Sequence, residues 1–230
     1  MGAILAMTPI HGRPLARLGL LGLLGLAACG NDPDASAMAE IGTIAGRITQ
    51  PRAAPVDAKA LLSPQVLAAA DQPVMLAEIP ARRAAASLIV AATNGSHVTW
   101  VSGDGITLTL QGGLLTASRG LGHDLMSADV SQSLQLLAGN AGTAVRVHRY
   151  LDGENQITLR SFVCSASSAG AETVDLITRR VSARIVTEDC VSSGESFTNR
   201  YWIAGSGHII RSEQWVGPET GMIRLLRVVD

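Results

Sequence analysis

The sequence predicts a mainly β protein, a large antiparallel meander of about 11 or 12 strands folded into a half-barrel or an open barrel. Beyond Pro73, short runs rich in Val, Ile, Leu and Thr are separated by turn residues about every 8 to 12 positions. Asn94-Gly95, Asp104-Gly105 and Gly112-Gly113 lie between these runs and supply the positive φ angles that tight hairpins require. A sheet with so many strands curls or folds on itself.

A short helical segment precedes the strands. Residues 56–70 fit a short helix that contains Pro64, and Pro51 and Pro55 interrupt the chain just before it. The first strands are expected at residues 74–79, 87–93, 97–102, 106–111 and 114–118. The pattern is clearest at 106–111, where Ile and Leu alternate with Thr and Gln, so that one face is apolar and the other polar.

Residues 120–142 interrupt the strand pattern. They begin with glycines and polar residues, continue into the apolar Leu134, Leu136 and Leu137, and form the longest segment that fits no hairpin. After Asp152-Gly153 marks a turn, the pattern resumes. The strands expected beyond the interruption are residues 143–151, 156–165, 173–177, 181–187, 196–204, 208–216 and 222–229.

Residues 1–28 have the layout of a secretory signal. Arg13 and Arg17 precede an uncharged run of leucine and glycine that ends in Leu26-Ala27-Ala28-Cys29. The run is shorter than the roughly 20 apolar residues that a transmembrane helix needs, so a transmembrane anchor is not expected. Met7 is an alternative start to Met1, because the segment from Met7 keeps both arginines and the whole apolar run.

The Leu-Ala-Ala-Cys sequence resembles the bacterial lipobox, in which the peptide bond before the cysteine is cut and the cysteine is acylated. We therefore expect lipid on Cys29; the alternative is an ordinary signal with an incidental cysteine. Two or more acyl chains give stable membrane attachment. Gly30, in place of Asp, favours the outer membrane by the enterobacterial sorting rule. Residues 29–39 are then a flexible tether, and residues 40–230 a single β-rich domain in the periplasm.

Charge and cysteine content narrow the function classes. Removal of residues 1–28 takes away two arginines and changes the formal net charge from −1 to −3, and no basic stripe remains, so nucleic acid is not an expected partner. Cys164 and Cys190 form an even pair in a compartment that permits disulfides, and we expect a bond between them; two buried free thiols are the alternative. No second Cys or His stands at ligand spacing beside either, which argues against a metal site.

His123-Asp124 is the strongest catalytic fragment, with His97, His148 and His208 as candidate partners. Neighbouring side chains in a strand point to opposite faces, so this dipeptide alone does not build a base and the carboxylate that orients it. No nucleophile elbow, zinc helix or phosphate loop occurs, and we expect no catalytic residue and no cofactor. Asp124 is instead expected to cap the turn after Gly120 and Gly122.

Two further groups have both a chemical and a structural interpretation. Glu188-Asp189, like Asp152 with Glu154, could supply an acid and a base, but both pairs are interpreted as solvated residues of turns or strand ends. The three tryptophans, Trp100, Trp202 and Trp215, lie in predicted strands, where core packing is expected. The alternative is that Tyr201-Trp202 presents an aromatic face to sugar.

Residues 98–102, 104–108 and 119–129 resemble the group 4 capsule polysaccharide lipoprotein family of the GfcB/YjbF type. The most specific part is Thr99-Trp100 followed, at residues 119–125, by Arg-Gly-Leu-Gly-His-Asp-Leu. The resemblance implies an antiparallel meander bent around itself, in an outer-membrane lipoprotein that faces the periplasm. It also implies a non-enzymatic role in secretion or assembly of capsule or exopolysaccharide.

On this resemblance the partners would be the membrane, through the lipid, and the polysaccharide and proteins of the export machinery. An alternative function is a lipid- or glycan-binding carrier module of the periplasm. The candidate contacts for glycan or partner are Trp100, Arg119, His123, Asp124 and Trp202.

Overall fold

The structure is a computed structural model that describes residues 62–139 and 142–229. The predicted signal, the predicted acylation site at Cys29, the tether and residues 56–61 of the predicted helix lie outside the described residues. Among the residues that are described, no helix is long and apolar enough to span a bilayer.

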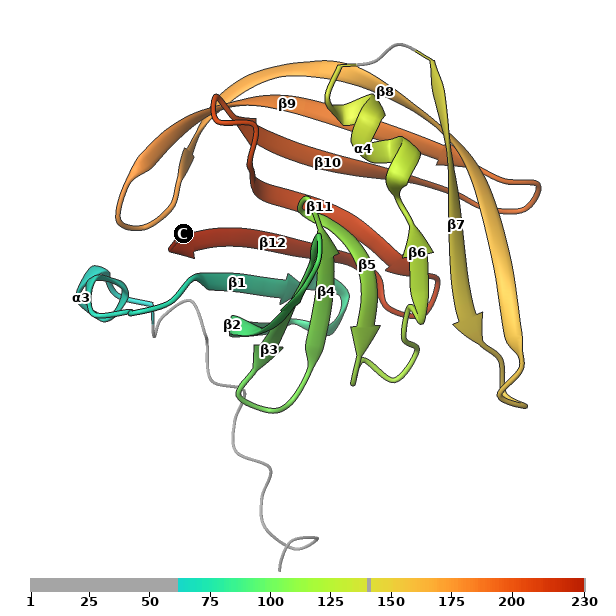
Figure 1. Cartoon of the computed structure of the whole chain (residues 1–230), viewed down its shortest axis with the longest axis horizontal. Helices are drawn as coiled ribbons and strands as arrows, with labels where there is room; N and C mark the ends of the chain where they lie inside the picture. The colour runs from blue at the N-terminus through green and yellow to red at the C-terminus, as the bar shows by residue number, and fades with distance from the viewer. Residues whose placement is uncertain (1–61, 140–141, 230) are drawn as a thin grey trace, which may run out of the picture. The chain divides into compact units, whose positions relative to one another are not determined.

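Twelve antiparallel strands form one sheet, which curls into a nearly closed barrel (Figure 1). The mainly β meander predicted from the sequence is confirmed. The strands are β1 (Val74–Ile79), β2 (Ala84–Asn94), β3 (His97–Ser102), β4 (Thr107–Gln111), β5 (Leu114–Arg119), β6 (Ser127–Asp129), β7 (Thr143–Leu151), β8 (Ile157–Asp175), β9 (Arg180–Val191), β10 (Ser196–Ala204), β11 (Ile209–Gly217) and β12 (Gly221–Val229). Three short helical elements accompany them, α3 (Pro64–Ala68), η1 (Pro80–Arg82) and α4 (Ser131–Leu137).

The first and last strands are neighbours in the middle of the sheet. The strand order is β5-β4-β3-β2-β1-β12-β11-β10-β9-β8-β7-β6, so only β1 and β12 pair across a large distance in sequence, with Val74 opposite Val229. The two edges, β5 and β6, are consecutive along the chain. The Ser118 amide donates to the Leu125 carbonyl at 2.9 Å, so the residues just before β6 pair with β5 where the barrel closes.

Three elements differ from the sequence expectation. β8 is one strand, where two were predicted at 156–165 and 173–177, because the intervening small residues form a bulge between Ser168 and Ala171 instead of a turn. The interruption at 120–142 contains β6 and α4. Pro64 opens α3 at its first turn, capped by Ser63, and does not lie inside a longer helix.

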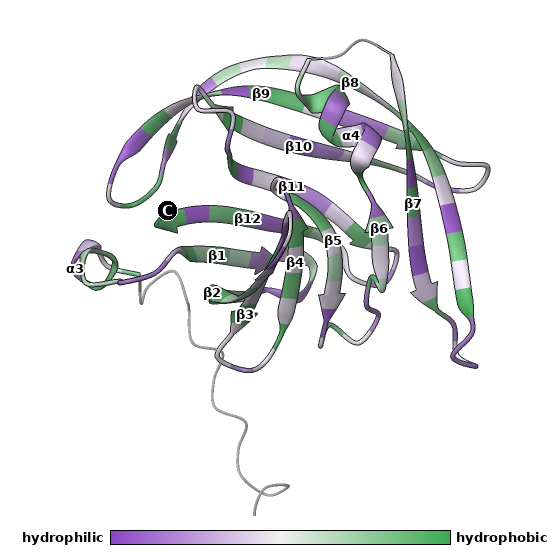
Figure 2. Ribbon diagram, viewed as in Figure 1, coloured by the Kyte–Doolittle hydropathy of each residue, from purple (hydrophilic) through white to green (hydrophobic). Residues whose placement is uncertain are grey.

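The core has an inner and an outer part. Inward-facing side chains of the sheet form the core inside the barrel. Apolar and polar residues alternate along the strands, as Figure 2 shows for β8. Outside the barrel, the far end of the β8–β9 hairpin folds back so that Val174 and Leu176 pack on Trp202 and Ile210. On the same sheet, Leu67 of α3 packs against residues of β1 and β12.

Candidate functional site

A cavity of about 510 Å³ lies inside the barrel between β1–β4 and β11–β12. We call it the barrel cavity. Its walls are mostly apolar, and the deepest wall residues are nearly inaccessible, with exposed fractions of 2% for Met75, 3% for Trp100 and 4% for Leu225. Val90, Val98, Leu110 and Ile209 also contribute apolar surface.

The barrel cavity opens at one end of the barrel. Its outer rim is formed by the β4–β5 turn at Gly112-Gly113, the β10–β11 turn at Gly207-His208, and Pro73 just before β1. Gly113 has a φ of 91°, and a Cβ there would lie 2.9 Å from the Ile209 Cβ. Glycine is therefore required at this position, both for the turn and for its close approach to β11.

Few charged groups line the barrel cavity. Arg227 projects inward beside Met75, and its guanidinium lies 5.8 Å from the centre of the Trp100 ring. His208 is exposed at the rim. Arg211 also borders the space, but its guanidinium stacks 4.1 Å from the Trp202 ring centre and pairs with Glu172 and Glu213. None of the described lining residues is acidic.

The opposite end of the barrel is closed by residues 120–126, which we call the closing loop. Asp124 accepts hydrogen bonds from the Ser118 hydroxyl at 2.8 Å and from the amides of Gly120 and Leu121 at 2.9 and 3.1 Å. The Arg82 guanidinium donates to the Leu121 carbonyl at 2.7 Å. The turn-capping role expected for Asp124 is thus present.

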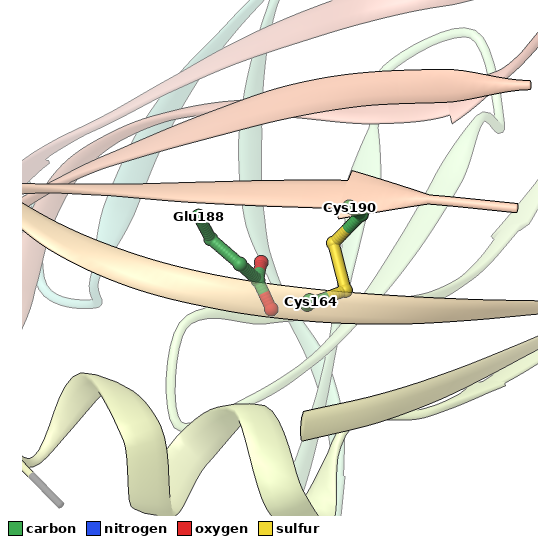
Figure 3. A group of neighbouring side chains, drawn as sticks. All are labelled: Cys164, Glu188 and Cys190. Carbon is green, nitrogen blue, oxygen red and sulfur yellow. A yellow bond between two sulfur atoms is a disulfide. The ribbon is translucent and has the colours of Figure 1, made fainter. Parts of the chain in front are cut away.

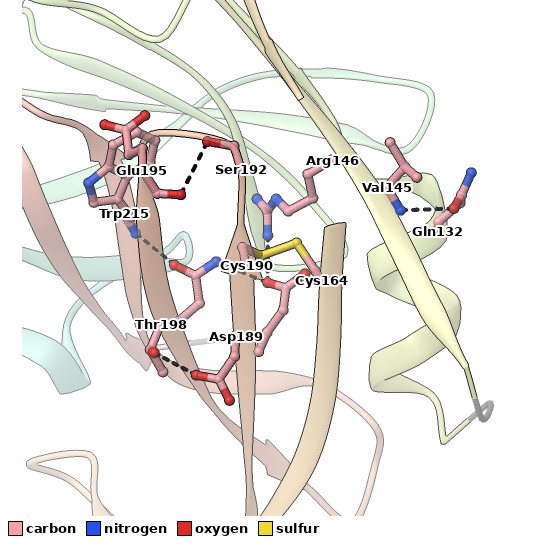
Figure 4. Close-up of a disulfide and its surroundings, with 12 residues drawn as sticks. Gln132, Val145, Arg146, Cys164, Asp189, Cys190, Ser192, Glu195, Thr198 and Trp215 are labelled. Carbon is pink, nitrogen blue, oxygen red and sulfur yellow. Dashed lines mark hydrogen bonds and ion pairs between the residues drawn. A yellow bond between two sulfur atoms is a disulfide. The ribbon is translucent and has the colours of Figure 1, made fainter. Parts of the chain in front are cut away.

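The other half of the barrel interior contains a buried ion pair. Arg146 of β7, which is labelled in Figure 4, lies 2.7 Å from Glu188 of β9. The side chains of Arg146 and Glu188 are 2% and 0% exposed. Asn199 and Tyr201 of β10 each donate to the same carboxylate oxygen, Glu188 Oε2, at 2.9 Å. These four residues, the buried ion-pair centre, tie three strands together from inside the barrel.

The sequence interpretation of Glu188 as a solvated residue was wrong. Glu188 lies within β9 and faces the interior, whereas Asp189 beside it is exposed and accepts a hydrogen bond from Thr198. Burial alone would raise the pKa of Glu188, but Arg146 and the hydrogen bonds to its carboxylate lower it below its ordinary value. Glu188 is therefore ionised, and with no exposed surface it cannot act on a substrate.

An aromatic cluster surrounds His148 next to the buried ion-pair centre. Its imidazole stacks on Phe197 and Trp215, at centroid distances of 5.8 and 5.7 Å, and lies 5.3 Å from Phe162. Its Nδ1 is 3.1 Å from the Tyr150 hydroxyl. Burial, together with the positive charges of Arg146 and Arg160, lowers the pKa of His148 to about 3, so this histidine is neutral.

The predicted disulfide is present, joining Cys164 of β8 to Cys190, directly opposite in β9. Glu188 lies beside it, and ligand atoms of Cys164, Glu188 and Cys190 are all within 4.8 Å of one another (Figure 3). A disulfide offers no thiolate, and Arg146 pairs with the carboxylate. The donor set therefore does not fit a metal ion.

The structure does not bring the five predicted contact residues together. Trp100 lines the barrel cavity, while the segment from Arg119 to Asp124 is at the closed end, where Arg119 donates to the carbonyls of Leu125 and Met126. His123 is exposed, and its carbonyl accepts from Thr220. Trp202 is only 2% exposed on the outer side of the barrel, and Tyr201 is completely buried, so neither ring offers a face to sugar.

Sequence reasoning missed Arg146 and the donors Asn199 and Tyr201 as partners of Glu188. In β7 the inward positions carry Ala144, Arg146 and His148, and the outward positions carry valines, of which Val145 is 42% exposed. Hydrophobic alternation therefore suggests the wrong buried face for this strand. Only the pairing of β7 through β8 to β9 reveals that Arg146 and Glu188 meet.

The fold is that of a known bacterial lipoprotein structure. The crystal structure of the hypothetical lipoprotein YmcC from Escherichia coli K12 matches with a TM-score of 0.65 and 16% identity, over 85% of this chain and 97% of that chain. At this identity the likeness shows the fold alone.

The family is shown by the sequence. Residues 43–228 match the model of the group 4 capsule polysaccharide lipoprotein family, GfcB/YjbF, and the chain belongs to this family. No curated protein matches the chain. Membership of this family supports a capsule-related role for this chain, as a membrane-associated lipoprotein.

Proposed function

We propose that this chain is a non-catalytic accessory in the secretion or assembly of capsule or exopolysaccharide, anchored to the outer membrane through Cys29 and facing the periplasm. The observation that carries the proposal is the family match, which covers residues 43–228 and hence nearly all of the β domain. The lipobox and Gly30 support the anchor and its membrane.

The geometry of the interior supports a non-catalytic role. General acid–base chemistry requires a titratable group within reach of a bound substrate. Among the described lining residues of the barrel cavity, His208 is the one histidine, and no carboxylate accompanies it. The buried carboxylate, Glu188, is inaccessible and bonded to three donors.

Gene deletion tests this proposal. Under conditions in which the polymer is made, deletion should reduce surface polysaccharide, and a copy of the unsubstituted gene should restore it. A copy carrying Cys29→Ser, which removes the acylated thiol, should restore less although the protein accumulates. The linkage composition of the remaining polymer should not change, because no catalytic step is lost. Unchanged surface polysaccharide after deletion would refute the accessory role.

A second candidate function, a lipid- or glycan-binding carrier, is favoured by one observation, the barrel cavity. Permanent attachment argues against a shuttle between membranes. The tether predicted at residues 29–39 would reach at most roughly 35 Å when fully extended. A chain anchored in this way can present or receive a ligand only close to its own membrane.

A further inference from the structure

We propose that the outer face of β7, β8 and β9 is the contact between two copies of this chain, which pack face to face around a twofold axis. These strands are neighbours in the sheet, and β7 and β8 form the flank at the right in Figure 1. Such a dimer is independent of the proposed function, because it involves only the outside of the barrel.

Exposed apolar side chains are concentrated on this face. Among the described residues, eight large apolar side chains are exposed, and the six that lie here, which we call the outer apolar patch, are Val145, Leu151, Ile157, Leu159, Val163 and Val191. The other two are single residues on α3 and β2. Val163 lies directly opposite Val145 of β7 and Val191 of β9, so the patch is continuous across three strands.

The outer apolar patch faces away from the core. The residues that alternate with it are at most 1% exposed and belong to the interior: Ala144, Phe162, Cys164 and Cys190. This part of the sheet therefore has apolar side chains on both faces. Antiparallel strands with one face in water carry polar residues on that face, whereas strands that are apolar on both faces are covered on both sides. Further along β8, the outward positions are Ser165 and Ser167, which confines the apolar character to the patch.

The size of the outer apolar patch matches a weak dimer. Its six side chains, 42% to 62% exposed, present on the order of 400 Å² of apolar surface. Because about 60% of an interface is apolar, this corresponds to roughly 650 Å² per copy and roughly 1,300 Å² in total. Specific interfaces bury about 1,200 to 2,000 Å² in total, and those near the lower limit are weak. We therefore expect a dissociation constant in the micromolar range.

Two copies of this face are compatible in shape and in charge. Sheets pack face to face through interdigitated side chains, and a twofold axis places the same patch on both sides. Arg149 lies opposite Leu159, and Asp129 of β6 lies opposite Val147. Hydrogen bonds from Ser131 and, to a smaller extent, the positive charge of Arg149 lower the pKa of Asp129. Because these two charges offset one another, a second copy meets little like-charge repulsion.

A bilayer is a poorer match for this face than a second copy. Proteins that lie on a bilayer present Trp or Phe together with several Lys or Arg residues. Among the described outward residues of 143–151, 157–165 and 189–191, Arg149 is the one cation and none is aromatic. The composition of the face therefore favours protein over lipid.

Sedimentation equilibrium of the full chain with Cys29→Ser tests the dimer. A monomer–dimer equilibrium is expected at micromolar concentrations. Val163→Lys places a charge in the contact and should weaken dimerisation at least about tenfold. Leu159→Lys should do the same, and it decides if circular dichroism shows that Val163→Lys does not fold. Ile89→Lys is the matched control, since Ile89 is 41% exposed on β2, and it should dimerise as the parent does.

A photoreactive phenylalanine analogue in place of Val163 identifies the occupant in cells. Irradiation should give a product of twice the chain mass that joins residue 163 to β7, β8 or β9 of a second copy. The analogue in place of Ile89 should give no such product. The proposal is overturned by a chain that stays monomeric, by equal effects of Val163→Lys and Ile89→Lys, or by cross-links from residue 163 to lipid or another protein instead of a second copy.

Discussion

Glu188 keeps its charge in the barrel interior because three donors converge on one of its oxygens, Oε2, while the other, Oε1, has no hydrogen-bond partner. Removal of one member of a buried ion pair leaves the other charge without compensation. The cost is therefore larger than the loss of a single hydrogen bond.

Glu188→Gln should destabilise the protein by about 3 to 5 kcal/mol, because Arg146 would then be buried with no counter-ion. Urea unfolding at pH 7 measures the effect. The control is Asp189→Asn on the exposed side of the same strand, which should change stability by no more than about 1 kcal/mol. If the Glu188→Gln protein were as stable as the parent, the ion pair between Arg146 and Glu188 would make no net contribution to the free energy of unfolding.

His148 should make stability depend on pH. Its pKa in the folded state is about 3, whereas an unfolded chain has a histidine pKa of about 6.5. Below about pH 6.5 the unfolded state gains a proton that the folded state excludes, so stability falls. Between pH 7.5 and pH 5 this should cost about 2 kcal/mol. His148→Phe should remove that loss in unfolding measurements, while His123→Gln, in the exposed loop, should not.

At the residue scale, the sequence predicted the disulfide because Cys164 and Cys190 are an even pair in a chain with a predicted export signal. It predicted the cap at Asp124 because turn chemistry is local. It did not predict the pairing of Arg146 with Glu188. Polar side chains at inward positions contradict the hydrophobic alternation from which burial is inferred, and their partners come from strands that are not adjacent in sequence.

At the scale of elements, the closing loop joins the two edge strands, β5 and β6, and holds them together without a continuous ladder. Asp124 organises the loop, and Arg82 and Thr220 attach it to the turns on either side of the β1–β12 pair. The Arg-Gly-Leu-Gly-His-Asp-Leu segment thus closes the barrel.

Asp124→Ala should loosen this closure. Loss of three hydrogen bonds to a carboxylate should cost about 1 to 3 kcal/mol, and the amides of Ser118 and Leu125 should exchange with solvent faster than those of β1 and β12. Hydrogen exchange measures this directly. Asp152→Ala, which removes a similar cap from the β7–β8 turn, is the control and should leave Ser118 and Leu125 protected. Equal exchange in both variants would contradict a closing role.

Most strands could be predicted because their alternation and their turn residues are local signals. α4 was missed because Val130, before its first turn, provides no side-chain cap and because the helix has only seven residues. The division of β8 into two strands was wrong because Gly170, with a φ of 97°, bends the strand without ending it.

At the scale of the whole molecule, all neighbouring strands are consecutive along the chain except β1 and β12. The sheet is a simple meander in space, but its first and last strands along the chain, β1 and β12, lie in its middle. Closure of the β1–β12 pair must therefore wait for nearly the whole domain to be present, and such non-local pairings slow folding.

This strand order makes the protein suited to circular permutation. If residue 229 were joined to residue 74 by a short linker and the chain were opened within the closing loop, every ladder would connect consecutive strands, from β6 through β12 and β1 to β5. The permuted protein should keep its circular dichroism spectrum and refold faster in stopped-flow measurements. The barrel itself therefore does not need β1 and β12 to be its first and last strands.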